Sequence, residues 1–299
     1  WIYAAVLMTA LYAFYQRVVG VEVSASLTDL SLNAGVPGRV YSTLDNANNY
    51  AEFLVLFTPL CVTWAMQRES HTARFFACSG IALPLLALVM TYSRSGWLSI
   101  AAAALVFVYY LDKRLIPPAF VVCILAIPFL PDSIMTRVLT IFNPADSSAS
   151  FRILVWQGVL DLLADFGFTG IGMGPYTFAN IFPLYAVNEH TTAVVHSQML
   201  YLELFLEWGA LGFIGFMWLM LRHVKDSAFA ITRERDKSLR LGLTATLSGF
   251  CGIAVLSVFE YIWYYPRILF AFFILLGAAL GLMRAAKAGN KLKGDADAR

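Results

Sequence analysis

A histidine and two glutamates recur at helical spacing where a long polar stretch re-enters an apolar one: His196, Glu203 and Glu207. Offsets of seven and eleven residues return to nearly the same face of an α-helix, because each residue advances about 100°. Ionisable groups at membrane depth normally face a protein interior or a watery cavity. We therefore expect one polar stripe that points into a site. The alternative is a histidine that only caps or anchors a helix at the membrane interface.

Three arginines stand in polar stretches between apolar segments: Arg39, Arg94 and Arg152. Arg94 is flanked by hydroxyl side chains and precedes a helix start, whose backbone N–H groups favour an anion. Arg152 should share a helical face with Trp156, four residues later. A guanidinium group is a planar fork that binds phosphate in bidentate fashion. These arginines indicate recognition of an anion such as a phosphate, unless they only extend to lipid headgroups.

The composition is that of a membrane protein with several spans. The 299 residues are 60% hydrophobic and 13% charged, and the mean hydropathy is +0.70. The four cysteines lie in apolar runs without CxxC spacing, so we expect neither a disulfide framework nor a zinc site. Glu189, His190 and His196 also lack the spacing of metal ligands. We expect no metal, no cofactor and no nucleic-acid partner.

About eight apolar segments approach the length that crosses a bilayer core of roughly 30 Å. The sequence thus predicts an all-α fold, a polytopic bundle of transmembrane helices. Helices 1–5 fall in 1–130 with an outer loop at 20–49, a large loop covers 131–197, helices 6–8 fall in 198–283, and a basic tail covers 284–299. The predicted spans are Trp1–Val19, Tyr50–Met66, Phe75–Thr91, Gly96–Leu111, Leu115–Leu130, Met199–Leu221, Leu239–Val258 and Ile262–Met283.

Basic residues predict the orientation of these spans. The positive-inside rule places in the cytoplasm the connections that follow the second, fourth, sixth and eighth spans, because most of the arginines and all of the lysines lie in this set of connections. On the other side all basic residues are arginines, of which we expect Arg17 and Arg137 to be interfacial anchors. That outer set is Arg17, Arg39, Arg94, Arg137, Arg152 and Arg267.

Four stretches together resemble the superfamily of O-antigen ligases and Wzy-type polymerases, over roughly Gly38 to Gly212. The family's Arg…Asn-Pro-Asn-x-x-Ala pattern has Ala47 where proline is usual, and its His-Asn pair has Ser197 where asparagine is common. The four stretches are Arg39…Asn46-Ala47-Asn48…Ala51, Thr91–Trp97, Phe151-Arg152…Trp156 with the Gly170–Gly174 turns, and His196…Glu207-Trp208-Gly209-Ala210-Leu211-Gly212. Family members carry further spans before this region, so we expect the chain to be the later part of a longer protein.

The resemblance implies a membrane glycosyltransferase of the helical type called GT-C. Such enzymes, in the bacterial inner membrane, move a glycan from a polyprenyl-diphosphate carrier such as undecaprenyl diphosphate to a hydroxyl acceptor on the periplasmic face. The acceptor is lipid A core, a growing glycan or a protein. Arg39, Arg94 and Arg152 are then the residues expected to bind the donor diphosphate, and His196 is the expected general base. Asn48, Glu203 and Glu207 are expected to support them.

Ligase and polymerase remain alternatives, because acceptor specificity lies in loops without a recognisable pattern. A membrane transporter is the alternative from a different functional class. Transporters tend to show repeated halves and ionisable residues near the membrane centre, whereas the candidate residues here gather at one surface.

Overall fold

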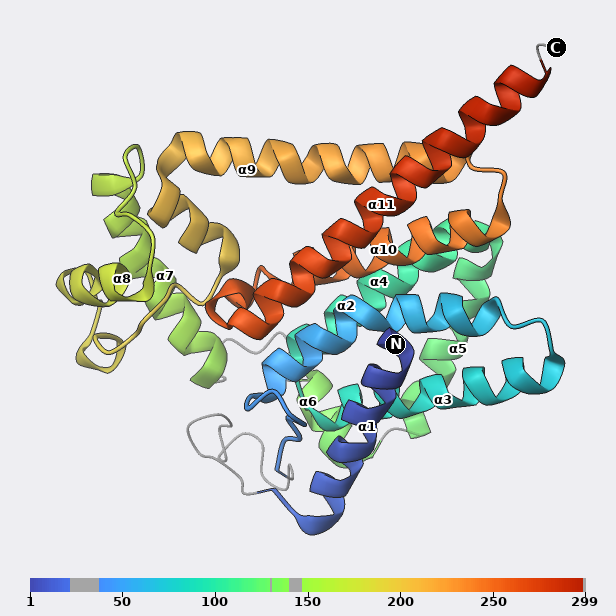
Figure 1. Cartoon of the computed structure of the whole chain (residues 1–299). Helices are drawn as coiled ribbons and strands as arrows, with labels where there is room; N and C mark the ends of the chain where they lie inside the picture. The colour runs from blue at the N-terminus through green and yellow to red at the C-terminus, as the bar shows by residue number, and fades with distance from the viewer. Residues whose placement is uncertain (22–37, 130, 140–146, 298–299) are drawn as a thin grey trace.

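The computed structural model describes residues 1–21, 38–129, 131–139 and 147–297, and this part of the chain contains helices and no strand (Figure 1). The predicted all-α fold is therefore confirmed. The α-helices are α1 (Ile2–Val19), α2 (Ala47–Met66), α3 (His71–Met90), α4 (Arg94–Asp112), α5 (Ile116–Ala126), α6 (Asp132–Leu139), α7 (Ser147–Phe166), α8 (Pro175–Ile181), α9 (Leu200–Arg233), α10 (Lys237–Leu256) and α11 (Pro266–Asp297).

Helices α2 and α10 form the centre of the bundle. Helix α2 packs against α1, α3, α4, α10 and α11, and α10 packs against α2, α4, α9 and α11. Two glycines allow the close approach of α10: a Cβ at Gly249 would lie 2.5 Å from the carbonyl oxygen of Leu56, and one at Gly252 would lie 2.8 Å from a methyl group of Val55. The core of the molecule thus lies where these helices cross.

In the part of the chain that the structure describes, five helices are long and apolar enough to cross a membrane by themselves, namely α1, α3, α9, α10 and α11. The helical segments 94–129 and 132–139 meet at a bend of 119° and can be counted together as one further span. The number of spans is then at most six in the described residues, whereas the sequence predicted eight. Helix α5 has 11 residues and reaches only about 16 Å at 1.5 Å per residue. Helix α2 carries polar residues, among them Asn48, Asn49 and Glu52, and neighbouring helices bury most of its surface. A helix enclosed in this way does not need a uniformly apolar sequence.

Two predicted boundaries in the second half of the chain are wrong. Helix α9 begins at Leu200, after His196, and it continues to Arg233 through the basic stretch that was expected to be a loop beyond Leu221. The helix expected to carry Arg152 and Trp156 is present as α7, which begins at Ser147. Of the predicted outer loops, residues 22–37 and 140–146 lie outside the described part of the chain.

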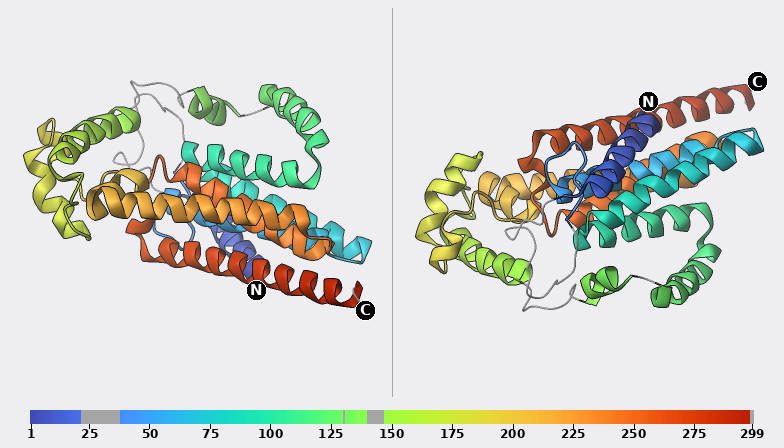
Figure 2. Two further views of the ribbon diagram at one scale, coloured as in Figure 1. Left: turned by 90° about the horizontal axis from the view of Figure 1, so that it is seen from above. Right: turned by 90° about the horizontal axis from the view of Figure 1, so that it is seen from below.

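The bundle has two different ends. Helices α7 and α8 gather beyond one end, and both views of Figure 2 place the C-terminal end of α11 at the other. The basic α2–α3 and α9–α10 connections also lie at that other end (Figure 1). The expected segregation of basic connections from the large loop is therefore visible in the arrangement of the helices.

Candidate functional site

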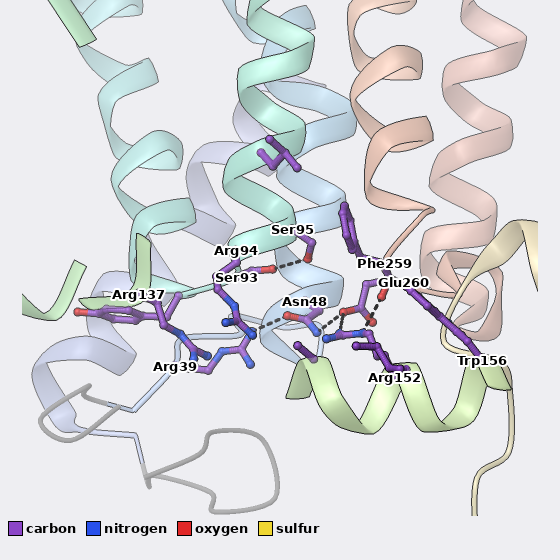
Figure 3. Close-up of a pocket in the computed structure, with 14 residues that line it drawn as sticks. Arg39, Asn48, Ser93, Arg94, Ser95, Arg137, Arg152, Trp156, Phe259 and Glu260 are labelled. Carbon is purple, nitrogen blue, oxygen red and sulfur yellow. Dashed lines mark hydrogen bonds and ion pairs between the residues drawn. The ribbon is translucent and has the colours of Figure 1, made fainter. Parts of the chain in front are cut away.

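A cavity of about 220 Å³ lies at the end of the bundle that carries α7. Its walls come from the segment before α2, from α2, α4, α6 and α7, and from the connection between α10 and α11 (Figure 3). The lining residues are Arg39, Asn48, Tyr92, Ser93, Arg94, Ser95, Leu98, Arg137, Ala149, Arg152, Ile153, Trp156, Phe259 and Glu260. The cavity therefore brings together all three predicted arginines, Asn48 and Trp156.

Helix α1 fixes the segment that carries Arg39. The Gln16 side chain accepts hydrogen bonds from the backbone N–H groups of Tyr41 (3.2 Å) and Ser42 (2.8 Å) and donates one to the carbonyl oxygen of Ser42 (3.1 Å). Arg39 Nε donates to the carbonyl oxygen of Thr91 at the end of α3 (2.8 Å). The guanidinium group is thereby held between α3 and the first turn of α2.

The turn between α3 and α4 places Arg94 at the first position of α4. Ser93 is the N-cap of this helix, and its hydroxyl accepts the backbone N–H of Gly96 (3.3 Å). Tyr92 has a positive φ of 50°, and its hydroxyl lies 3.3 Å from the Ser133 hydroxyl on α6. The turn thus places Arg94 at the cavity (Figure 3). Tyr92 connects the same turn to α6.

Glu260 is the functional candidate that the sequence did not reveal. Its Oε1 atom accepts hydrogen bonds from Arg152 Nη2 and from Asn48 Nδ2, both at 2.7 Å. Asn48 Oδ1 accepts in turn from Arg39 Nη2. A continuous series of hydrogen bonds therefore joins Arg39, Asn48, Glu260 and Arg152 (Figure 3). The available signal was an acidic residue at the end of an apolar span, which is the criterion already applied to Glu203.

Arg137 is not the interfacial anchor that was expected. It is 4% exposed and lines the cavity with the other arginines. The reason is that α6 folds back towards the bundle, where the bent pair changes direction. Arg137 therefore belongs with the candidate anion-binding residues.

Charge in the cavity favours an anion. Among the described lining residues there are four guanidinium groups and one carboxylate, that of Glu260. Burial and the charge of Arg137 lower the pKa of Arg39 to about 10, so Arg39 still carries its charge at neutral pH. Burial raises the pKa of Glu260, whereas the neighbouring Arg152 and Arg39 act in the opposite direction. The net charge of these lining groups is positive when Glu260 is ionised.

His196 lies beside the cavity and is not among its lining residues. Its ring packs against Tyr261 (5.6 Å between centroids) and Tyr264 (4.6 Å), and its Nδ1 accepts the backbone N–H of Gln198 (3.2 Å). Trp156, on the cavity wall, donates from Nε1 to the carbonyl oxygen of Ser197 (3.0 Å). Burial, together with the charge of Arg152, lowers the pKa of His196 to about 4. The imidazole is therefore neutral at physiological pH.

The expected polar stripe of His196, Glu203 and Glu207 on one helix is wrong. His196 precedes α9, and the two glutamates hold loop backbone in place. Glu203 Oε2 accepts the backbone N–H of Ser197, next to His196. Glu207 Oε1 accepts the backbone N–H of Gly174 (3.0 Å), and the Glu207 side chain also bonds the hydroxyl of Tyr261. Both glutamates thus stabilise the loop from inside the bundle.

The glycines of the 170–174 stretch dock on a break in α9. At Gly209 the backbone leaves the helical conformation with φ 67° and ψ −178°. The backbone N–H groups of Ile171 and Gly172 donate to the carbonyl oxygens of Leu206 (2.7 Å) and Glu207 (3.2 Å) just before the break. These two N–H groups are bonded within the protein, so they are not available to bind a phosphate.

Comparison with known proteins gives one family. A family model described as O-antigen ligase matches residues 79–217, from within α3 to within α9. The match includes Arg94 and Arg152, whereas Asn48 and Glu260 lie outside it. A search of curated proteins found no match. Among the described residues, no group of three or more His, Cys, Asp or Glu side chains could hold a metal ion.

Proposed function

We propose that this chain, whose family match supports membership of the O-antigen ligase and polymerase superfamily, transfers a glycan from a polyprenyl-diphosphate carrier to a hydroxyl acceptor. The family supports an O-antigen ligase-like, glycan-modifying function in a membrane. The donor and the acceptor are our proposal. The observation that carries it is the convergence of Arg39, Arg94, Arg137 and Arg152 on one cavity at the end of the bundle opposite the basic connections.

The cavity suits a reaction in which a diphosphate leaves. Negative charge grows on the diphosphate as its bond to the sugar breaks, and fixed cationic groups stabilise that charge most in a site with little water. Arg39 and Arg152 are held by hydrogen bonds to α2, α3 and the α10–α11 connection. Because they are oriented before the donor arrives, they need little reorganisation during the reaction.

His196 is our candidate for accepting the proton of the acceptor hydroxyl. Its lowered pKa keeps the ring neutral, as a base requires. In the described conformation Nδ1 accepts the Gln198 N–H, so the neutral ring carries its proton on Nε2. Acting as a base therefore requires the ring to exchange the Gln198 contact for the acceptor hydroxyl. The hydrogen bond from Trp156, on the cavity wall, to the carbonyl oxygen of the adjacent Ser197 supports this role.

We further propose that the cavity faces the periplasm of a bacterial inner membrane. The supporting observation is the distribution of charge: the basic α2–α3 and α9–α10 connections lie at the opposite end of the bundle, and the positive-inside rule assigns them to the cytoplasm. A lipid-linked donor could then present its diphosphate at the membrane surface near α7.

Lysine substitution tests the proposal, because it keeps the charge and removes the fork. We expect Arg39→Lys and Arg94→Lys to lose most of the transfer of glycan from a purified polyprenyl-diphosphate donor, and to weaken donor binding. Arg267→Lys is the matched control. Arg267 is an exposed arginine that pairs with Asp45 and does not line the cavity. Normal transfer in both cavity variants, at normal expression, would remove the arginines from the site.

Polymerase activity is the second candidate, because the family includes both activities. The lipid-linked glycans of a deletion strain separate the two. Unpolymerised lipid-linked repeats would indicate a polymerase, and intact polymer that is not joined to lipid A core or another acceptor would indicate a ligase. Intact lipid-linked donor on the wrong side of the membrane would instead indicate a transporter.

A further inference from the structure

We propose that Glu260 is a positioning residue that, through Asn48, fixes the spacing and orientation of two donor-binding arginines, Arg39 and Arg152. The inference rests on the proposed function, because it takes the cavity to be a diphosphate site. It adds a role for two side chains outside the segment matched by the family model.

The orientation of the Asn48 amide is the first observation. An amide has one donor end and one acceptor end. The donor end of Asn48 faces Glu260 at 2.7 Å, and its acceptor end faces Arg39. Because Glu260 is a carboxylate and Arg39 a guanidinium group, a flipped amide would lose both hydrogen bonds. Glu260 thus determines which way Asn48 points, and Asn48 determines where the Arg39 guanidinium lies.

The pair of hydrogen bonds that holds the Arg152 guanidinium group is the second observation. Its Nη2 donates to Glu260 Oε1 at 2.7 Å, and its Nε donates to the carbonyl oxygen of Phe259 at 3.1 Å. Two contacts to neighbouring residues fix the plane of the guanidinium group as well as its position. The side chains of Arg152 and Glu260 are 18% and 12% exposed, so water competes little for these bonds.

The common acceptor atom is the third observation. The bonds from Asn48 and Arg152 both end on Oε1 of Glu260, which lies between them in Figure 3. One atom therefore sets the distance between the α2 side and the α7 side of the cavity. A diphosphate has two charged groups at a fixed separation, and its recognition depends on that distance. A single phosphate does not test the spacing in the same way.

The length of Glu260 and its charge can be tested separately. Glu260→Gln keeps the length and an acceptor oxygen but loses the charge, whereas Glu260→Asp keeps the charge and is one methylene shorter. If position matters, we expect Glu260→Gln to bind farnesyl diphosphate within about fivefold of the native chain. We expect Glu260→Asp to bind it at least tenfold more weakly, because a shorter side chain cannot reach both Asn48 and Arg152. Farnesyl monophosphate should bind equally to both variants.

An exchange of amide and carboxylate is the rescue experiment. Asn48→Asp alone sets two carboxylates against each other, and we expect diphosphate binding to fall at least tenfold. The double variant Asn48→Asp/Glu260→Gln restores a donor between positions 48 and 260, keeps acceptors for both arginines, and leaves the total charge unchanged. We expect it to recover most of the lost affinity. Asn48→Asp/Ser95→Lys is the control: it also restores the total charge, on the cavity wall, but leaves two carboxylates facing each other at positions 48 and 260, so we expect it not to recover the affinity.

Binding is measured with the purified full chain in detergent. Thermal unfolding confirms that each variant is folded, and KM and kcat are measured for glycan transfer. A Glu260→Asp variant that binds like the native chain would overturn the inference, as would a double variant no better than Asn48→Asp. A fall in kcat alone would instead make Glu260 a base. If the native chain does not bind farnesyl diphosphate, or if Arg39→Lys binds it normally, the proposed function itself fails.

Discussion

The break in α9 makes a quantitative prediction for Gly209→Ala. The backbone at Gly209, with φ 67° and ψ −178°, lies in a region that is essentially restricted to glycine and costs other residues about 1–3 kcal/mol. The new Cβ would also lie 2.5 Å from the carbonyl oxygen of Phe168, so the docked loop would have to move. Loss of the two hydrogen bonds from Ile171 and Gly172 adds about 1 kcal/mol each.

These contributions sum to about 3–5 kcal/mol against the docked loop, which is a factor of about 10²–10³ or more in its opening equilibrium. Hydrogen exchange of the amides at 170–174 measures that equilibrium directly. Gly215→Ala is the control, because Gly215 lies in the same helix and nothing stands within 4 Å of its would-be Cβ. If the amides at 170–174 exchanged equally slowly in both variants, the docking of this loop on α9 would be incorrect.

Further predictions concern the pH dependence, His196, the topology and Arg137. With a pKa of about 4, His196 stays about 97% neutral at pH 5.5, whereas an unperturbed histidine would be only about 9% neutral. Transfer activity should therefore hold to about pH 5, and an acid limb centred on pH 6.5 would contradict the burial of the ring. His196→Ala should bind the lipid-diphosphate donor and lose about 10²–10⁴ in rate, whereas His190→Ala should remain active; a fully active His196→Ala would remove the proposed base. In a cysteine-free background, an impermeant maleimide added outside should label Thr192→Cys and spare Ser238→Cys, both at exposed positions, and the reverse pattern would invert the proposed orientation. Arg137→Lys should weaken transfer measurably, contrary to what an interfacial anchor would do.

Residue type alone identified much of the cavity. Arg39, Arg94 and Arg152 were found because a guanidinium group in a polar stretch between apolar spans has few structural reasons to be there. Their convergence could not be read from the sequence, since it depends on how α2, α4 and α7 are packed. The family resemblance supplied the order of the stretches, and the geometry of the cavity came only from the structure.

Glu260 and the start of α9 show what the sequence could not provide. The partners of Glu260 are Asn48, 212 residues earlier, and Arg152, 108 residues earlier, and no local pattern records such contacts. Periodicity placed His196 on the helix, but the backbone N–H of Leu200 is bonded to the carbonyl oxygens of Ser257 (3.0 Å) and Glu260 (3.2 Å). A contact with the α10–α11 connection therefore accompanies the helix start, and helical periodicity carries no information about it.

The distance in sequence between Asn48 and Glu260 also has a consequence during biosynthesis. A ribosome that adds about 5–20 residues per second needs roughly 10–40 s to travel the 212 residues between them. During that time α2, then α4 and then α7 are made without the carboxylate that bridges Asn48 and Arg152. The site is therefore completed only when the connection after α10 has been made, so a nascent chain arrested before Glu260 would contain all four cavity arginines and still lack the bridge.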